Sequence, residues 1–251
     1  MKKFSVVPFL VIAVGALVLG GNGLAQNRPA ADATTPPDFS GIWVGNLADI
    51  TTALLPGEEI VLTPYGAEMY KKVDMAKAPS YECLPYGPTR GLQSTNAYMI
   101  IPTPNLFTII MESIDYRLIY TDGRGHPEDM LDYPEWMGHS IGRWEGDTLV
   151  VDTIGMREET WLDTAGFGHS AQLRLTERFR KTGPDAFTLT VAVNDPVFYA
   201  KPFTYQRTVR RMPKDTRLMP GRCADAGLNS LPDALPGIAG PEHKTPPKFP
   251  Q

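Results

Sequence analysis

The chain has 251 residues, of which 42% are hydrophobic and 21% charged, and these values are ordinary for a globular protein. The composition excludes a collagen-like, a coiled-coil and a wholly disordered chain. The formal net charge of −4 leaves no basic footprint of the kind that nucleic-acid binding requires, so we expect no nucleic-acid partner.

The first residues have the order of a secretory signal peptide. Two lysines precede an apolar run over residues 4–19, and small residues follow up to Ala25. This order predicts a signal peptide over residues 1–25 and a periplasmic or secreted mature protein without a membrane span. An uncleaved membrane anchor is the alternative, although the apolar run is short for a span and contains a proline.

Composition divides the rest of the chain into three parts. We expect a linker over residues 26–38, one β-barrel domain over residues 39–227, and a flexible proline-rich tail over residues 228–251. The mature chain has two cysteines, Cys83 and Cys223. Because an even pair in an oxidising compartment suggests a disulfide, we expect these two to be paired, with a reactive thiol as the alternative.

The domain is dominated by short β-branched and aromatic runs that are bounded by turn residues. Only residues 64–73 favour a helix, since Thr63 can cap its start and a proline takes the first helical position. The pair Gly146-Asp147 between two apolar runs indicates a β-hairpin. The predicted strands cover residues 39–44, 98–101, 106–112, 116–121, 141–145, 148–154, 173–180, 187–194 and 203–210.

Nine strands with short links and one helix are typical of an antiparallel barrel or sandwich. Gly41 and Trp43 resemble the opening motif of lipocalin-type barrels. We therefore expect a mainly β fold, a single antiparallel, lipocalin-like β-barrel. The long loops 122–140 and 155–170 should lie over one mouth of this barrel.

Glu177 is unusual because every second residue around it is polar, and strand alternation places it on the opposite, apolar face. A buried carboxylate is costly unless it is paired. Glu177 could be a general acid or base or a metal ligand, or it could form a structural ion pair with Arg117, Arg143 or Arg207. Asp152 is a second candidate for an inward carboxylate, with a strand-end residue that bonds a loop as the alternative.

Three of the four histidines, His126, His139 and His169, fall in loops rich in Gly, Pro or Ser. Together with Glu177 or Asp163 they could bind a transition metal, or a histidine could act as a general base without a metal. Loop histidines that bond the backbone are the simpler alternative. Their spacing matches no standard metal motif, so the sequence leaves the metal and any other cofactor unknown.

Aromatic and basic residues near these histidines could line a pocket. Trp136 and Trp161 favour an aromatic or apolar ligand, and Arg124 and Arg143 could stabilise negative charge on it. Packing is the alternative role for the tryptophans. The sequence contains no phosphate-binding glycine loop, no dinucleotide fingerprint and no Cys-x-x-Cys pair, so no nucleotide cofactor is indicated.

The central segment resembles a large family of secreted bacterial proteins of unassigned function. The resemblance rests on TDGRGHP at residues 121–127 and GHSIGRWEGDTLVVDT at residues 138–153, and it extends from the first cysteine to the second. Gly168 stands where the family has proline, and Phe203 where it has tryptophan. The resemblance implies no activity. It implies a recurring pattern that contains His126, His139, Asp163, His169 and Glu177.

Two functions fit these observations. The first is a secreted enzyme that performs proton-transfer chemistry (isomerisation, cyclisation, lyase or hydrolytic) on a small apolar or aromatic molecule in a barrel pocket. The second is a non-catalytic periplasmic carrier that holds a similar molecule in the barrel. An enzyme would bring titratable groups within hydrogen-bond reach of one another, and a carrier pocket would be mostly apolar.

Overall fold

The computed structural model describes residues 35–46, 49–113, 115–219 and 221. The expected signal peptide, most of the expected linker, the proline-rich tail and Cys223 lie outside these residues. The pairing of Cys83 with Cys223 therefore stays a prediction. Within the described ranges, no helix has the length and apolarity that crossing a membrane would take.

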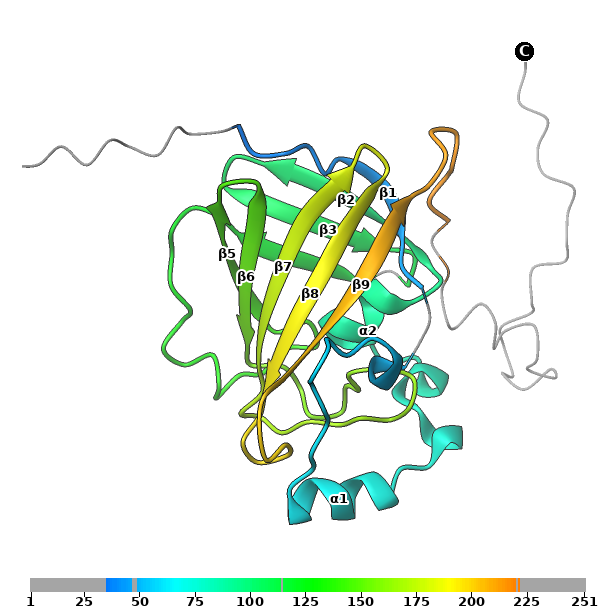
Figure 1. The fold of residues 1–251 in the computed structure, drawn as a ribbon, viewed down its shortest axis with the longest axis vertical. Coiled ribbons are helices and arrows are strands. Elements are labelled where there is room, and N and C mark those ends of the chain that lie inside the picture. Colours follow the sequence, from blue (N-terminus) through cyan, green and yellow to red (C-terminus); the bar gives the residue numbers. More distant parts are fainter. Residues whose placement is uncertain (1–34, 47–48, 114, 220, 222–251) are drawn as a thin grey trace, which may run out of the picture. The chain divides into compact units, whose positions relative to one another are not determined.

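The described chain forms a closed barrel of nine strands, which confirms the predicted mainly β, lipocalin-like barrel (Figure 1). All nine predicted runs are strands. In sequence order the strands are β1 (Gly41–Val44), β2 (Ala97–Thr103), β3 (Leu106–Met111), β4 (Tyr116–Tyr120), β5 (His139–Glu145), β6 (Thr148–Ile154), β7 (Arg174–Gly183), β8 (Ala186–Asn194) and β9 (Phe203–Arg211).

One strand pair departs from the predicted antiparallel arrangement. β4 and β5 are parallel, with Ile119 opposite Ser140, whereas every other neighbouring pair of strands is antiparallel. A parallel connection must return to the end from which the first strand started. Residues 121–138 make this return along the outside of the barrel, where Figure 1 shows the connection bowing away from the strands. Most of this loop therefore lies along the barrel wall. Its predicted position over a mouth of the barrel, which rested only on the number of its residues, is wrong.

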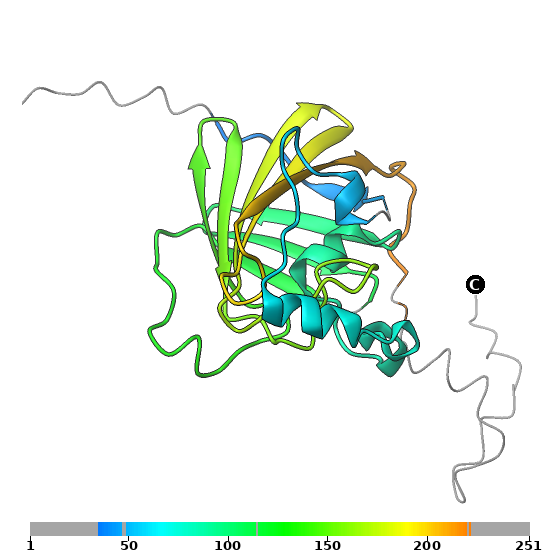
Figure 2. The ribbon, with the colours of Figure 1, turned by 60° about the horizontal axis from the view of Figure 1, so that its bottom comes forward.

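The predicted helix is α1 (Pro64–Lys71), where Thr63 Oγ1 accepts a hydrogen bond from Gly66 N at 3.0 Å. A second helix, α2 (Gly87–Gln93), was not predicted, because its residues are almost all buried and show no polar face. Short 3-10 segments cover Ile50–Thr52, Met75–Lys77 and Pro79–Glu82. Figure 2 brings forward the end of the barrel across which α1 and the neighbouring loops lie.

The opposite end of the barrel is filled by aromatic rings. The rings of Phe39 and Phe107 lie 5.7 Å apart, and those of Trp43 and Phe187 lie 4.9 Å apart. The guanidinium of Arg211 lies 4.3 Å from the centre of the Trp43 ring and covers it. At this end of the barrel, side chains therefore occupy the lumen, which is the interior of the barrel.

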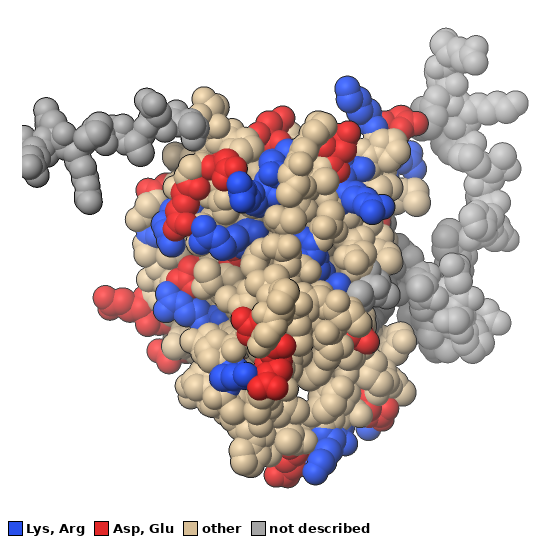
Figure 3. Space-filling view, viewed as in Figure 1, with Lys and Arg blue, Asp and Glu red and all other residues tan. Residues whose placement is uncertain are grey.

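Charges of both signs are interspersed on the face drawn in Figure 3. On the exposed side of β7, Arg178 pairs with Glu145 at 2.7 Å and Arg180 with Asp147 at 3.4 Å. Such exposed pairs contribute little to stability, but they neutralise the arginine-rich face of this strand.

Candidate functional site

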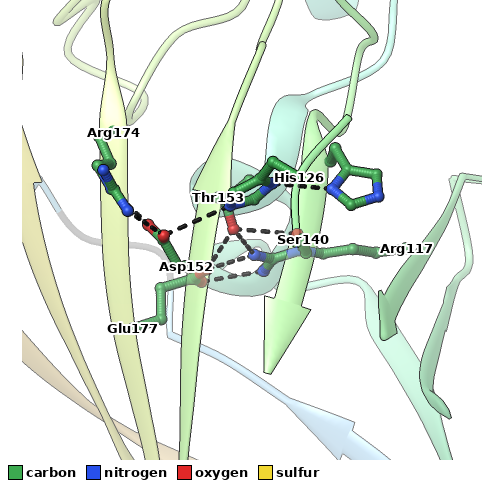
Figure 4. A network of polar contacts seen from close by, with 8 residues as sticks. Arg117, His126, Ser140, Asp152, Thr153, Arg174 and Glu177 are labelled. Carbon is green, nitrogen blue, oxygen red and sulfur yellow. Dashed lines mark hydrogen bonds and ion pairs between the residues drawn. The ribbon is translucent and has the colours of Figure 1, made fainter. Parts of the chain in front are cut away.

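Glu177 lies in the lumen and is bound to Arg117, which is one of the three arginines named as structural partners. Arg117 Nη1 donates to Glu177 Oε1 at 2.9 Å, and Arg117 Nη2 donates to Glu177 Oε2, with both side chains fully buried. Arg117 also donates to Ser140 Oγ at 3.1 Å and to Thr153 Oγ1 at 2.8 Å. We call these four residues the inner network (Figure 4).

The contacts of the inner network leave neither carboxylate oxygen of Glu177 available to a substrate. The guanidinium occupies both carboxylate oxygens, and both side chains are fully buried. Removing either partner would leave an unpaired buried charge. The arrangement supports the structural alternative for Glu177.

A second set of polar side chains lies on the outer face of the same strands. Nδ1 of His126 and Nδ1 of His139 are 2.8 Å apart, and Nε2 of His126 lies 3.4 Å from Asp152 Oδ2. Arg174 donates to both oxygens of Asp152, with 2.7 Å from Nε to Oδ1. We call these four residues the outer network; Figure 4 shows Arg174, Asp152 and His126 in line.

Asp152 points outward, so its predicted inward position is wrong. In the register of β6 and β7, Val151 lies opposite Glu177, which places Val151 and Thr153 on the lumen face and Asp152 on the other. Val150 is buried although it shares the outward face with Asp152. Because Val150 is apolar, the sequence pattern predicted that the face it shares with Asp152 points into the lumen. This face points out of the barrel.

The proton positions of the outer network follow from its geometry. Only one hydrogen can lie between the two Nδ1 atoms, so one imidazole donates and the other accepts. A neutral His126 with its proton on Nε2 donates to Asp152 and accepts from the Nδ1–H of His139. With a single proton on His126, the opposite assignment would set its Nε2 lone pair against a carboxylate oxygen. The favoured arrangement leaves Nε2 of His139 unprotonated, and within the described residues no hydrogen-bond partner lies on it.

The surroundings of His139 favour its neutral form. Its ring stacks on Tyr120 at 5.4 Å, and the Arg124 guanidinium lies 4.0 Å from the centre of the Tyr120 ring on β4. Burial, and then the repulsion from Arg124 and from His126 whenever His126 is protonated on both nitrogens, lower the pKa of His139 below its ordinary value. For Asp152, burial works to raise the pKa, but hydrogen bonds and charge from Arg174, together with His126, hold the pKa below its usual range.

The remaining predicted catalytic residues lie elsewhere and brace loops. His169 is buried, with Nε2 at 2.7 Å from Thr160 Oγ1 and Nδ1 at 3.0 Å from the carbonyl oxygen of Ser170. Asp163 accepts hydrogen bonds from the backbone N–H of Ile50 at 2.9 Å and from Ala165 at 3.0 Å. The structure therefore brings together two of the three predicted histidines, and neither Asp163 nor Glu177 joins them.

The predicted substrate-binding residues are dispersed as well. Arg124 belongs to the stack beside His139, while Arg143 is exposed and pairs with Glu145 at 2.7 Å. Trp161 lines a small cavity of about 150 Å³ together with His169. Trp136 lines a separate cavity of about 400 Å³.

Sequence reasoning missed Tyr120 and Arg174 and left Arg117 as one of three candidate partners. The pattern of β4 contains a signal for Arg117, because Arg117 and Ile119 share a face and Ile119 is apolar. In the part of the chain that the structure describes, no three His, Cys, Asp or Glu side chains are arranged to hold a metal ion.

Comparison with models of known protein families finds no match for this chain, and comparison with curated proteins finds no similar one. The resemblance to a family of secreted bacterial proteins therefore stays a prediction.

The buried ion pair gives a stability prediction. Glu177→Gln leaves the Arg117 charge unpaired in the lumen, and we expect the free energy of unfolding to fall by roughly 3–5 kcal/mol. The double variant Arg117→Met/Glu177→Leu removes both charges and should be clearly more stable than the single variant. Urea unfolding followed by tryptophan fluorescence measures both. A Glu177→Gln variant as stable as the parent chain would contradict the buried pair.

The buried His169 gives a pH prediction. Burial lowers its pKa in the folded chain, whereas the unfolded chain takes up a proton near pH 6.5. The unfolded state therefore binds more protons as the pH falls below 6.5, so stability is full above that pH and declines below it. His169→Gln should flatten this decline in unfolding measured from pH 7.5 to pH 5. An equal decline in the variant and in the parent chain would show that His169 does not carry it.

Proposed function

We propose that this protein is a secreted enzyme that moves a proton on a small apolar or aromatic molecule, with Nε2 of His139 as the proton acceptor. The observation that carries the proposal is the contact of 2.8 Å between the two Nδ1 atoms, backed by Asp152 on the far side of His126. In this chain of groups Asp152 positions His126 to take the Nδ1 proton of His139 once Nε2 of His139 has accepted a proton from the substrate.

The proton would move in two steps. Nε2 of His139 takes a proton from a C–H, O–H or N–H bond of the substrate, and the bonding electrons stay on the substrate. The Nδ1 proton of His139 can then shift to Nδ1 of His126, which becomes an imidazolium beside Asp152. His139 is left neutral with a proton on Nε2, which it can return to another atom of the substrate. A base that becomes a donor in this way suits an isomerisation or a lyase reaction.

The stack beside His139 has a separate role in this proposal. Arg124 is held by Asp122, whose carboxylate accepts a hydrogen bond from Arg124 Nε at 2.9 Å. Arg124 and His139 both contact the Tyr120 ring, and the positive charge of Arg124 disfavours a second positive charge on His139. Arg124 is also a cation on this side of the barrel that could stabilise negative charge developing on the substrate.

The packing of the barrel favours this wall over the lumen. Aromatic rings fill one end of the barrel, and the inner network crosses the middle. An enzyme or a carrier that takes its ligand into the lumen would have to displace these side chains. We therefore propose the outer network as the working site and do not favour the carrier. The secreted location and the family resemblance enter this proposal from the sequence alone.

Proton exchange tests the proposal directly. A panel of small aromatic carbonyl compounds that carry removable C–H protons is incubated in D₂O, and deuterium uptake is followed by NMR. We expect uptake above the buffer rate, and His139→Gln should slow it by roughly 10²–10⁴-fold, the usual contribution of a general base. His126→Gln and Asp152→Asn should cause smaller losses.

Arg143→Gln is the matched control, because Arg143 lies on the same strand as His139 but pairs only with Glu145. It should leave uptake unchanged. Uptake at the parental rate in folded His139→Gln, or no uptake above the buffer rate with any compound, would overturn the proposal.

A further inference from the structure

A cavity of about 400 Å³ is lined by residues at the start of β4 and by residues that precede β5. Trp136 and Met137 line it and lie three and two residues before His139 in the chain, and Tyr116 lines it from the start of β4. Since β4 and β5 run parallel, Tyr116 and Trp136 both lie before the point where Tyr120 stacks on His139. The cavity and the outer network thus share the wall formed by these two strands.

The cavity has two aromatic walls. The Tyr116 side chain is exposed, with a relative exposure of 63%, although it is large and aromatic. The Arg157 guanidinium lies 4.3 Å from the centre of the Trp136 ring and covers one face of the indole. A ligand can meet the rest of the indole and the phenol, and both surfaces suit a flat ring.

The charges around the cavity are unbalanced. Arg157, its one cationic lining residue, is neutralised by Glu159 at 2.6 Å. Asp115 and Glu135 also line the cavity, and among the described residues neither is part of an ion pair. Burial raises the pKa of Asp115, so its charged form would gain from a cation placed nearby. Asp115 accepts hydrogen bonds from Ser113 Oγ at 3.1 Å and from the backbone of Tyr86, but no described cation pairs with it, so the cavity presents negative charge beside its aromatic rings.

We propose that this cavity binds an aromatic ring that carries a positively charged amine, with the ring between Tyr116 and Trp136 and the ammonium group beside Asp115. Aromatic faces and a carboxylate both attract an ammonium group, and both repel an anion. The inference rests on the proposed function in one respect, because it takes arylalkylamines to be the class of substrate from which His139 accepts a proton.

Three probes with the same phenyl ring separate the contributions of ring and charge: 2-phenylethylamine, 2-phenylethanol and phenylacetate. Their binding to the full chain is measured by calorimetry and by the NMR shift of the tryptophan indole N–H groups. We expect the amine to bind roughly ten-fold more tightly than the alcohol, and phenylacetate to bind most weakly. Asp115→Asn should bring the amine and the alcohol within about three-fold of each other. Trp136→Ala should weaken both.

Glu68→Gln is the control for charge, since Glu68 lies on α1 and does not line the cavity, and it should leave the ratio unchanged. Equal binding of the three probes, no binding at 10 mM, or an amine preference that survives Asp115→Asn would overturn the inference. The binding measurement needs no turnover. Amine binding without proton exchange would contradict the proposed function alone, and proton exchange without amine preference would contradict this inference alone.

Discussion

The buried ion pair between Arg117 and Glu177 is the interaction on which the barrel depends most. The barrel has one parallel junction, between β4 and β5, where only the ends of the strands lie in register. Arg117 reaches across this junction from β4 to Ser140 on β5, and onward to Thr153 on β6 and Glu177 on β7. A single guanidinium thus ties four consecutive strands together across a seam where the backbones pair at only two positions. The N–H groups of Arg117 donate to buried acceptors, and these hydrogen bonds offset the free-energy cost of removing the guanidinium charge from water.

The outer network depends on this arrangement, because its members are neighbours of the inner ones along the strands. His139 precedes Ser140 on β5, and Asp152 precedes Thr153 on β6. Strand alternation turns each pair to opposite faces, so whatever fixes the inner residue also fixes the outer one. The two networks therefore lie back to back across the wall (Figure 4). A histidine pair whose proton positions depend on a few tenths of an ångström needs such a rigid support.

The sequence predicted the strands well, and the reason is physical. In β8 the residues Phe187, Leu189, Val191 and Val193 are all buried and alternate with small or polar neighbours, so periodicity alone reveals the strand and its inner face. The same rule placed Glu177 in the lumen. It could not choose among the three arginines, since that choice depends on which strands become neighbours.

The same limit explains the errors at the site. The parallel pairing of β4 and β5 is a long-range property, and it sent residues 121–138 along the outer wall, where His126 meets His139. Nothing in the local pattern distinguishes these two histidines from His169, since all three were expected in loops. That expectation is wrong for His139, which is the first residue of β5, whereas His169 lies in a loop and is buried against Thr160. Asp152 was assigned to the wrong face because the outer wall is itself partly covered, and a buried outward valine resembles an inward one.

The central claim is that His126 and His139 share one proton and leave Nε2 of His139 free to accept another. Nitrogen-15 NMR of the histidine rings at pH 7 tests it without any substrate. We expect a neutral His139 with its proton on Nδ1 and a bare Nε2, together with a proton on Nε2 of His126 that points to Asp152. A His139 that carries its proton on Nε2, or that is fully charged at this pH, would contradict the account.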